Sequence, residues 1–335
     1  MNQPKPLISV CMITYKHGPF IAQAIESVLM QKTDYPIELV IGEDRSPDHT
    51  RDVCQRYADQ HPDIIRLLPP EPNMGSQKNF IRTLYSCRGQ YIALLEGDDF
   101  WTDAYKLQKQ VELLVQNPEL VLTFHNVNIL ENDKVTGKVY PGPRKETINA
   151  EDVFKHDYYQ TCSILFRSGP LFAIDHSEAH EWIYNDITLF SLLLSDGSKG
   201  RYLPETMATY RVHPGGVWSM ADASKRYRIS RIAEDIILDK YFPNPQLRPL
   251  IAQRETLYYE LFMVESAKCH DLPLMLRTMA KFAQWSLRTN PLRLWKLLLP
   301  PIYLVRATLL NHRPVPKNVI VHKREKGQKR QSPIL

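Results

Sequence analysis

Alternating apolar and polar blocks predict strands and helices in turn over the first 130 residues. Five short apolar runs indicate strands, at residues 7–14, 37–43, 64–68, 90–96 and 120–130. The stretches between them repeat apolar residues at helical spacing, at 20–31, 48–60, 76–87 and 102–117. Strands that alternate with helices build parallel sheets, so we expect an α/β fold: a Rossmann-like, mostly parallel sheet flanked by helices.

The pattern changes after the fifth strand. It weakens over residues 131–160 and then predicts a strand, a helix and a strand, at 161–167, 186–195 and 201–213. Beyond residue 222 it is almost wholly helical. We therefore expect an α/β domain, a C-terminal helical extension and a basic, disordered tail, over residues 1–221, 222–310 and 311–335.

Composition narrows the class of protein. Apolar residues make up 43% of the chain and charged residues 24%, which is typical of a soluble globular protein. The five cysteines are scattered without a C-x-x-C pair, which argues against a thiolate zinc site and a disulfide framework. The sequence shows no signal peptide and no apolar window of about 18 residues, so we expect a cytoplasmic protein.

Positive charge gathers at the C-terminal end. Residues 311–335 hold seven Lys or Arg and one Glu, a net charge of +6 against +5 for the whole chain. The preceding stretch, 291–310, is rich in Leu with a few cations. Residues 291–335 could therefore attach peripherally to an anionic membrane at its inner face, or form a packed helix followed by a solvated tail. We expect no nucleic-acid partner.

Polar clusters follow four successive predicted strands. They are Thr14–His17, Glu43–Ser46, residues 71–79 and residues 96–101. In open α/β sheets, ligands bind outside the carboxyl ends of the strands, where these clusters would converge. The glycine-rich phosphate motifs G-x-G-x-x-G and G-x-x-x-x-G-K-[ST] are absent, so a metal is the other way to neutralise a diphosphate.

The acidic cluster EGDDFW suits such a metal. Closely spaced carboxylates at a strand end favour Mg²⁺ or Mn²⁺, which share oxygen ligands with substrate phosphates. If the strand geometry continues, Glu96 and Asp98 point to one side and Asp99 to the other.

Four segments occur in an order and at a spacing that resemble a known family: ISVCMITYKHGPFIAQAIESVLMQ, IELVIGEDRSPDHT, NMGSQKNF and YIALLEGDDFW. They are similar to the nucleotide-sugar glycosyltransferases of family 2, over about residues 6–215. The resemblance implies the GT-A fold and transfer with inversion at the anomeric carbon. The implied donor is a nucleotide-sugar, typically a UDP-sugar. The implied acceptor is a glycan or lipid-linked hydroxyl in surface polysaccharide synthesis.

The resemblance also implies donor-binding residues. Thr14 and Tyr15 stand where the family lines the base and ribose, and Asp44 where it accepts a hydrogen bond from the base. Three further positions match the segment that borders the nucleotide and the sugar: Asn73, Gly75 and Asn79.

Metal and catalytic roles follow from the same resemblance. Glu96-Gly97-Asp98 stands at the family's D-x-D, with Glu for the first Asp, so we expect metal ligation by Asp98 and nucleotide contact by Glu96 and Gly97. His213 matches a loop that approaches the diphosphate or the metal. Asp186 matches the catalytic base, although Asn185 replaces the acidic residue that commonly precedes it.

Structural alternatives remain open for several positions. Asp44 could be a structural residue of a turn, Asp186 could be the N-cap of a helix, and His213 could be a structural histidine before Pro214. Asp99 could serve the sugar or acceptor side, and Trp101 could stack on a sugar or belong to the core.

Two other functions also remain open. A nucleotidyltransferase would need a basic phosphate-gripping loop, and TYKHGPF offers only Lys16. A non-catalytic nucleotide-sugar-binding or scaffold protein would not need Asp98 and Asp186.

Overall fold

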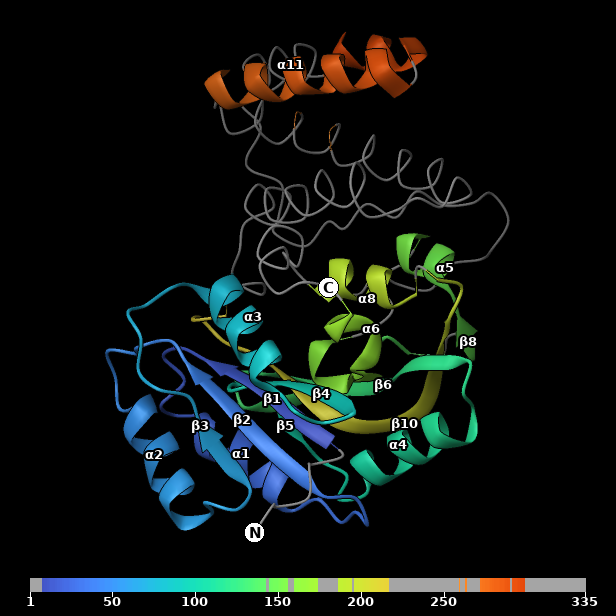
Figure 1. Ribbon diagram of the computed structural model, residues 1–335. Coiled ribbons are helices and arrows are strands. Elements are labelled where there is room, and N and C mark those ends of the chain that lie inside the picture. The colour runs from blue at the N-terminus through green and yellow to red at the C-terminus, as the bar shows by residue number, and fades with distance from the viewer. Residues whose placement is uncertain are drawn as a thin grey trace. The chain divides into compact units, whose positions relative to one another are not determined.

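The computed structural model describes residues 8–142, 145–155, 160–173, 186–194, 196–216, 259, 263, 272–289 and 291–298 (Figure 1). The chain divides into two compact units. One comprises Met1–Met220 with Ile232–Ile251, and the other Ala221–Arg231 with Ala252–Leu335. The first unit contains the sheet and the polar clusters at its strand ends.

A ten-stranded sheet organises the first unit, in the order β3-β2-β1-β4-β9-β6-β10-β5, with β7 beside β6 and β8 beside β10. The strands β1 to β4 pair in parallel, as β6 does with β10, whereas β9 and β5 run antiparallel to their neighbours. The predicted parallel α/β arrangement is therefore confirmed. The bounds are β1 Ile8–Thr14, β2 Ile37–Glu43, β3 Ile65–Leu67, β4 Tyr91–Glu96, β5 Phe100–Trp101, β6 Leu120–Glu131, β7 Lys134–Tyr140, β8 Thr147–Ile148, β9 Leu165–Arg167 and β10 Lys199–Val212.

Helices cover both faces of this sheet (Figure 1). Successive strand residues point to opposite faces, so Val10 and Met12 enter the core beneath α1, α2 and α4, while Cys11 enters the core beneath α3, α5, α6 and α8. The helix bounds are α1 Ile21–Leu29, α2 Thr50–Gln60, α3 Ser76–Ser86, α4 Lys106–Gln116, α5 Ala150–Lys155, α6 Gly169–Phe172 and α8 Asp186–Leu193.

Three segments differ from the sequence-based expectation. The helix predicted from residue 102 begins at Lys106, because Phe100 and Trp101 first pair with Thr209 and Ala208 of β10. The strand predicted at 161–167 is a 3₁₀ helix, η1 (Thr161–Ser163), followed by the short strand β9. The region of weak pattern, 131–160, contains β7, β8 and α5.

The carboxyl ends of three parallel strands lie side by side. The Gly97 N–H, just beyond β4, donates to the Ile13 carbonyl of β1 at 2.9 Å. On the other side of β1, the Asp44 N–H donates to the Thr14 carbonyl at 3.1 Å. Three of the predicted polar clusters therefore meet at one edge of the sheet.

The second unit is described in part. It contains α11 (Leu272–Thr289) and a 3₁₀ segment, η2 (Pro291–Leu298), with Phe282 packed against Tyr259 at 5.2 Å between ring centroids. Among the described helices, none has the length and apolar character needed to cross a membrane. The tail expected over residues 311–335, and most of the extension expected over 222–310, lie outside the described residues.

Candidate functional site

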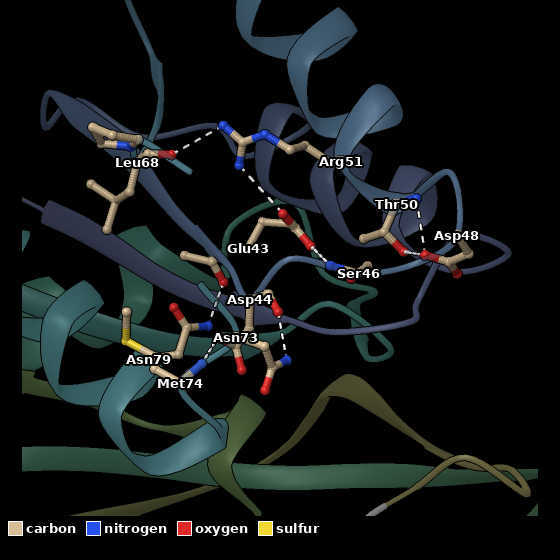
Figure 2. A network of polar contacts seen from close by, with 12 residues as sticks. Glu43, Asp44, Ser46, Asp48, Thr50, Arg51, Leu68, Asn73, Met74 and Asn79 are labelled. Carbon is tan, nitrogen blue, oxygen red and sulfur yellow. Dashed lines mark hydrogen bonds and ion pairs between the residues drawn. The ribbon is translucent and has the colours of Figure 1, made fainter. Parts of the chain in front are cut away.

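Asp44 anchors one half of the strand-end edge (Figure 2). Its side chain is buried, and its two carboxylate oxygens accept backbone N–H bonds from Met74 at 2.8 Å and Gly75 at 2.9 Å. The Asn73 amide donates to the Asp44 carbonyl at 2.7 Å. Asp44 therefore holds the loop before α3 in place, which is a structural role of the kind considered for it. Each oxygen keeps a second lone pair that could accept a bond from a ligand.

The loop that Asp44 holds is open on its other side. Asn73 and Gly75 are exposed, and Gly75 has φ +85°, a left-handed conformation that glycine adopts without strain. Asn79, one turn into α3, is buried and donates to the Gly42 carbonyl at 2.7 Å. Its side-chain oxygen has no hydrogen-bond partner among the described residues. The three predicted positions therefore lie around one loop that faces the end of β2.

The loops after β1 and β2 are tied together. The Lys16 N–H donates to Ser46 Oγ at 2.9 Å. The Ser46 N–H in turn donates to Glu43 Oε1 at 2.5 Å, as Figure 2 shows. Lys16 and Arg45 both have positive φ, 59° and 54°, which is uncommon for residues with side chains. Tyr15 belongs to the loop after β1 and is 40% exposed, with Lys16 Nζ lying 5.1 Å from the centre of its ring.

Gly97 allows the ends of β1 and β4 to approach closely. A Cβ at this position would lie 2.5 Å from Thr14 Oγ1 and 2.9 Å from Ile21 Cδ1, closer than real side chains come. Thr14 is buried, and its hydroxyl has no partner among the described residues. Glu96 lies at the end of β4 and is only partly buried. Thr14, Glu96 and Gly97 are thus brought together as predicted, next to Asp98.

Asp98 lies between two histidines. His213 Nε2 is 3.0 Å from Asp98 Oδ2, and His17 Nε2 is 3.6 Å from the same oxygen. One ligand atom from each of the three residues falls within 4.8 Å of the others. The structure therefore brings the two predicted metal residues together and adds His17. The sequence signal for His17 was its place in the polar cluster after the first strand.

The charges of this group favour metal binding. Burial alone would raise the pKa of the Asp98 carboxyl, but the hydrogen bond with His213 and the nearby imidazole of His17 hold that pKa below its ordinary value. Burial lowers the pKa of His17, against the opposing effect of Asp98. An ionised carboxylate and a neutral imidazole are the forms that bind a divalent ion. The donor set therefore suits a divalent metal.

Hydrogen bonding fixes the metal-free tautomer of His213. The Gly215 N–H donates to His213 Nδ1 at 3.2 Å. The proton of the neutral ring then resides on Nε2 and is donated to Asp98.

Arg211 holds the turn that contains Asp98 and Asp99 in position. Its backbone N–H donates to Asp99 Oδ1 at 2.8 Å, and its Nε donates to the Asp98 carbonyl at 2.9 Å. A third bond runs from its guanidinium to Gln23 Oε1 at 2.6 Å, which links β10 to α1. The sequence analysis missed Arg211, because its partners are more than a hundred residues away along the chain.

Asp99 and Trp101 lie in the interior. Trp101 is 1% exposed, its indole N–H donates to the Cys162 carbonyl at 2.9 Å, and Lys106 Nζ lies 4.2 Å from its ring centre. This is the core interpretation of Trp101, and such a side chain offers no free face to a sugar. Asp99 is also buried, and its burial together with the charges of Asp98 and Glu96 raises the pKa of its carboxyl. Neither side chain is exposed at the surface, so the predicted contact of Asp99 or Trp101 with a sugar or acceptor has no support in this arrangement.

Asp186 is the first residue of α8. The position and contacts of its side chain lie outside the described residues, as does the segment that precedes it. Its predicted role as a base, or as a cap of this helix, stays a prediction.

Known proteins resemble this chain in sequence and in fold. Residues 9–169 match glycosyl transferase family 2. An uncharacterized protein of Mycobacterium tuberculosis is 31% identical over 224 residues, which cover 65% of this chain and 62% of that protein. The chain thus spans less than two thirds of the length of this relative. The UDP-Glc:alpha-D-GlcNAc-diphosphoundecaprenol beta-1,3-glucosyltransferase WfgD of Escherichia coli is 32% identical over 143 residues, 43% of this chain and 54% of WfgD.

A solved structure shows the same fold. It is the mannosyltransferase PcManGT from Pyrobaculum calidifontis in complex with GDP-Man and Mn²⁺, with a TM-score of 0.56 and 17% identity. The likeness covers 92% of this chain and 87% of that protein. With the order of the sheet, it confirms the predicted GT-A fold.

Proposed function

This chain belongs to glycosyl transferase family 2, and we propose that it transfers a sugar from a nucleoside-diphosphate donor to a hydroxyl acceptor, with inversion. The observation that carries the proposal is that the carboxyl ends of β1, β2 and β4 lie side by side. Asp98, His17 and His213 gather beside β1, and the loop held by Asp44 lies on the other side of the same strand. A diphosphate at the metal group would leave its nucleoside within reach of the Asp44 loop.

The nucleoside half of the donor would lie over the ends of β1 and β2. The exposed ring of Tyr15 offers a stacking face, while Asn73 and Gly75 border the opening. The remaining lone pairs of Asp44 would accept the imino N–H of a uracil base. We therefore propose a UDP-sugar as the donor, which agrees with the UDP-Glc named for WfgD. Preference for a GDP-sugar, as bound by PcManGT, is the alternative that a donor screen would detect.

A divalent ion, Mg²⁺ or Mn²⁺, would be held by Asp98 with His213. Bound there, it would neutralise the charge that grows on the leaving diphosphate. Arg211 would hold the Asp98 turn in position, and Glu96 would contact the ribose directly or through water.

Asp186 is the proposed general base. It would take the proton of the acceptor hydroxyl as that oxygen attacks the anomeric carbon and the bond to the diphosphate oxygen breaks. Attack from the face opposite the leaving group inverts the centre in one displacement.

The proposed acceptor is a growing glycan or a lipid-linked sugar in surface polysaccharide synthesis, as the name of WfgD suggests by analogy.

A cytoplasmic enzyme acting on such an acceptor would work at the inner face of the membrane. Residues 291–335 could hold it there: Leu292 is 84% exposed, and residues 311–335 carry a net charge of +6. Flotation with anionic liposomes, comparing the full chain with one cut after Pro291, tests this; equal flotation would remove the membrane role.

Release of nucleoside diphosphate tests the proposed reaction. A panel of UDP- and GDP-sugars is incubated with acceptors, with Mn²⁺ or with chelator, using wild-type protein and Asp98→Asn. We expect release that requires the metal and is lost in the variant. In a parallel incubation with nucleoside triphosphates and a sugar 1-phosphate, release of pyrophosphate would indicate a nucleotidyltransferase. Donor binding without release across the panel would indicate a non-catalytic binding protein.

A further inference from the structure

His17 lies against the metal group in a way that a hydrogen bond does not explain. Its Nε2 is 3.6 Å from Asp98 Oδ2, too long for a hydrogen bond. Its Nδ1 is buried and has no partner among the described residues. Two ligands that sit about 2.1 Å from one ion lie roughly 3.0–3.4 Å from each other. The distances of 3.0 Å and 3.6 Å from Asp98 Oδ2 to His213 and His17 are close to that spacing.

We propose that His17 is a third protein ligand, and that the resulting two-imidazole, one-carboxylate site prefers Mn²⁺ and Co²⁺ to Mg²⁺. The inference rests on the proposed function in taking this cluster as the metal site. It goes further in assigning the residue that decides which ion is bound.

The preference follows from the chemistry of the donors. Mg²⁺ binds oxygen and gives up its water reluctantly, so a site dominated by imidazole nitrogens offers it little. First-row transition metals accept imidazole, and their affinity for a given site rises from Mn²⁺ to Co²⁺. With Asp98 as the one carboxylate of the cluster, each histidine that ligates moves the preference further from Mg²⁺.

The fold holds the two imidazoles in place for this role. The His213 ring packs on Phe20 at 4.8 Å between centroids and lies edge-on to His17 at 5.9 Å. The three residues follow the ends of β1, β4 and β10, so one ion would join segments that are far apart in sequence. Ligation through Nε2 of His213 leaves the proton on Nδ1, so the Gly215 contact opens as the ion binds.

The test titrates metal into the full chain without donor or acceptor. Co²⁺ is followed by its visible absorption, and Mn²⁺ and Mg²⁺ by calorimetry. Wild-type protein should bind Mn²⁺ at least about tenfold more tightly than Mg²⁺. His17→Gln should lose at least about tenfold in Co²⁺ and Mn²⁺ affinity and change the Co²⁺ spectrum, with little effect on Mg²⁺. His61→Gln, at the end of α2 and outside the cluster, is the matched control.

An unchanged Co²⁺ spectrum and affinity in His17→Gln would overturn the proposal, as would equal binding of Mg²⁺ and Mn²⁺ by the wild type. Circular dichroism without metal verifies that each variant is folded. Because no sugar is present, these titrations succeed or fail independently of sugar transfer, which the release assay measures separately.

Discussion

Replacing the buried Lys106 with Met should change how the stability of the protein depends on pH. Lys106 Nζ donates to Gln110 Oε1 at 2.6 Å and faces the Trp101 ring, with Cys162 and His125 also close enough to interact. Burial lowers the pKa of Lys106 from 10.5 to about 7, against the opposing effect of Cys162. In the unfolded chain the ordinary value of 10.5 returns.

The sign and size of the pH dependence follow from the difference between the pKa of Lys106 in the folded and in the unfolded chain. Below about pH 7 both states hold the proton, and folding bears the whole cost of an ammonium in the core. Between about pH 7 and pH 10.5 the unfolded chain holds a proton that the folded one has lost, so stability rises with pH. The full difference corresponds to roughly 5 kcal/mol, at up to about 1.4 kcal/mol for each pH unit.

Urea unfolding between about pH 7 and pH 9 measures the effect. Over that range the free energy of unfolding of the wild type should rise by roughly 2 kcal/mol relative to Lys106→Met. Loss of the donor to Gln110 costs about 1–3 kcal/mol at every pH, so the slope, and not the absolute value, is the readout. Lys109→Met, at a half-buried position of the same helix where Lys109 pairs with Asp103, should follow the wild-type slope. Parallel curves for wild type and Lys106→Met would refute the reasoning.

Substitutions at three further residues probe the site. Asp186→Asn should keep donor binding in a thermal-shift assay but lose about 10²–10⁴-fold in turnover, and wild-type turnover would exclude Asp186 as the base. Arg211→Met should lower the free energy of unfolding by roughly 2–3 kcal/mol and weaken Mn²⁺ binding, because the Asp98 carbonyl and Gln23 lose their donor. Arg211→Lys should restore little of either property, since Lys lacks the planar guanidinium with its several donors. Full rescue by Lys would contradict this role. Gly97→Ala should cost about 1–3 kcal/mol in urea unfolding, because its Cβ would press on Thr14 at 2.5 Å, and unchanged stability would show that the strand ends can separate freely.

The sequence was sufficient for the parts of the fold that local pattern determines. The strands β1, β2 and β4 and the helices between them have strong periodicity, and their order implies a parallel sheet with polar clusters at one edge. Asp98 and His213 came from motif matches, and the structure places them 3.0 Å apart.

Features set by distant contacts were beyond the sequence. Trp101 forms β5 because Ala208 pairs with it, and this pairing also delays α4 to Lys106. Arg211 acts through Asp98, Asp99 and Gln23, none of which is near it in sequence. His17 is one of several polar residues after β1, and only the approach of Asp98 distinguishes it.

The configuration of the product tests the central claim most directly. Wild-type protein is incubated with Mn²⁺, the donor that it turns over and its acceptor, and the anomeric proton of the product is assigned by NMR. The account predicts a new glycosidic bond whose configuration is opposite to that of the donor, formed only with the metal and not by Asp98→Asn. A product that retains the donor configuration, or that forms equally without metal, would contradict it.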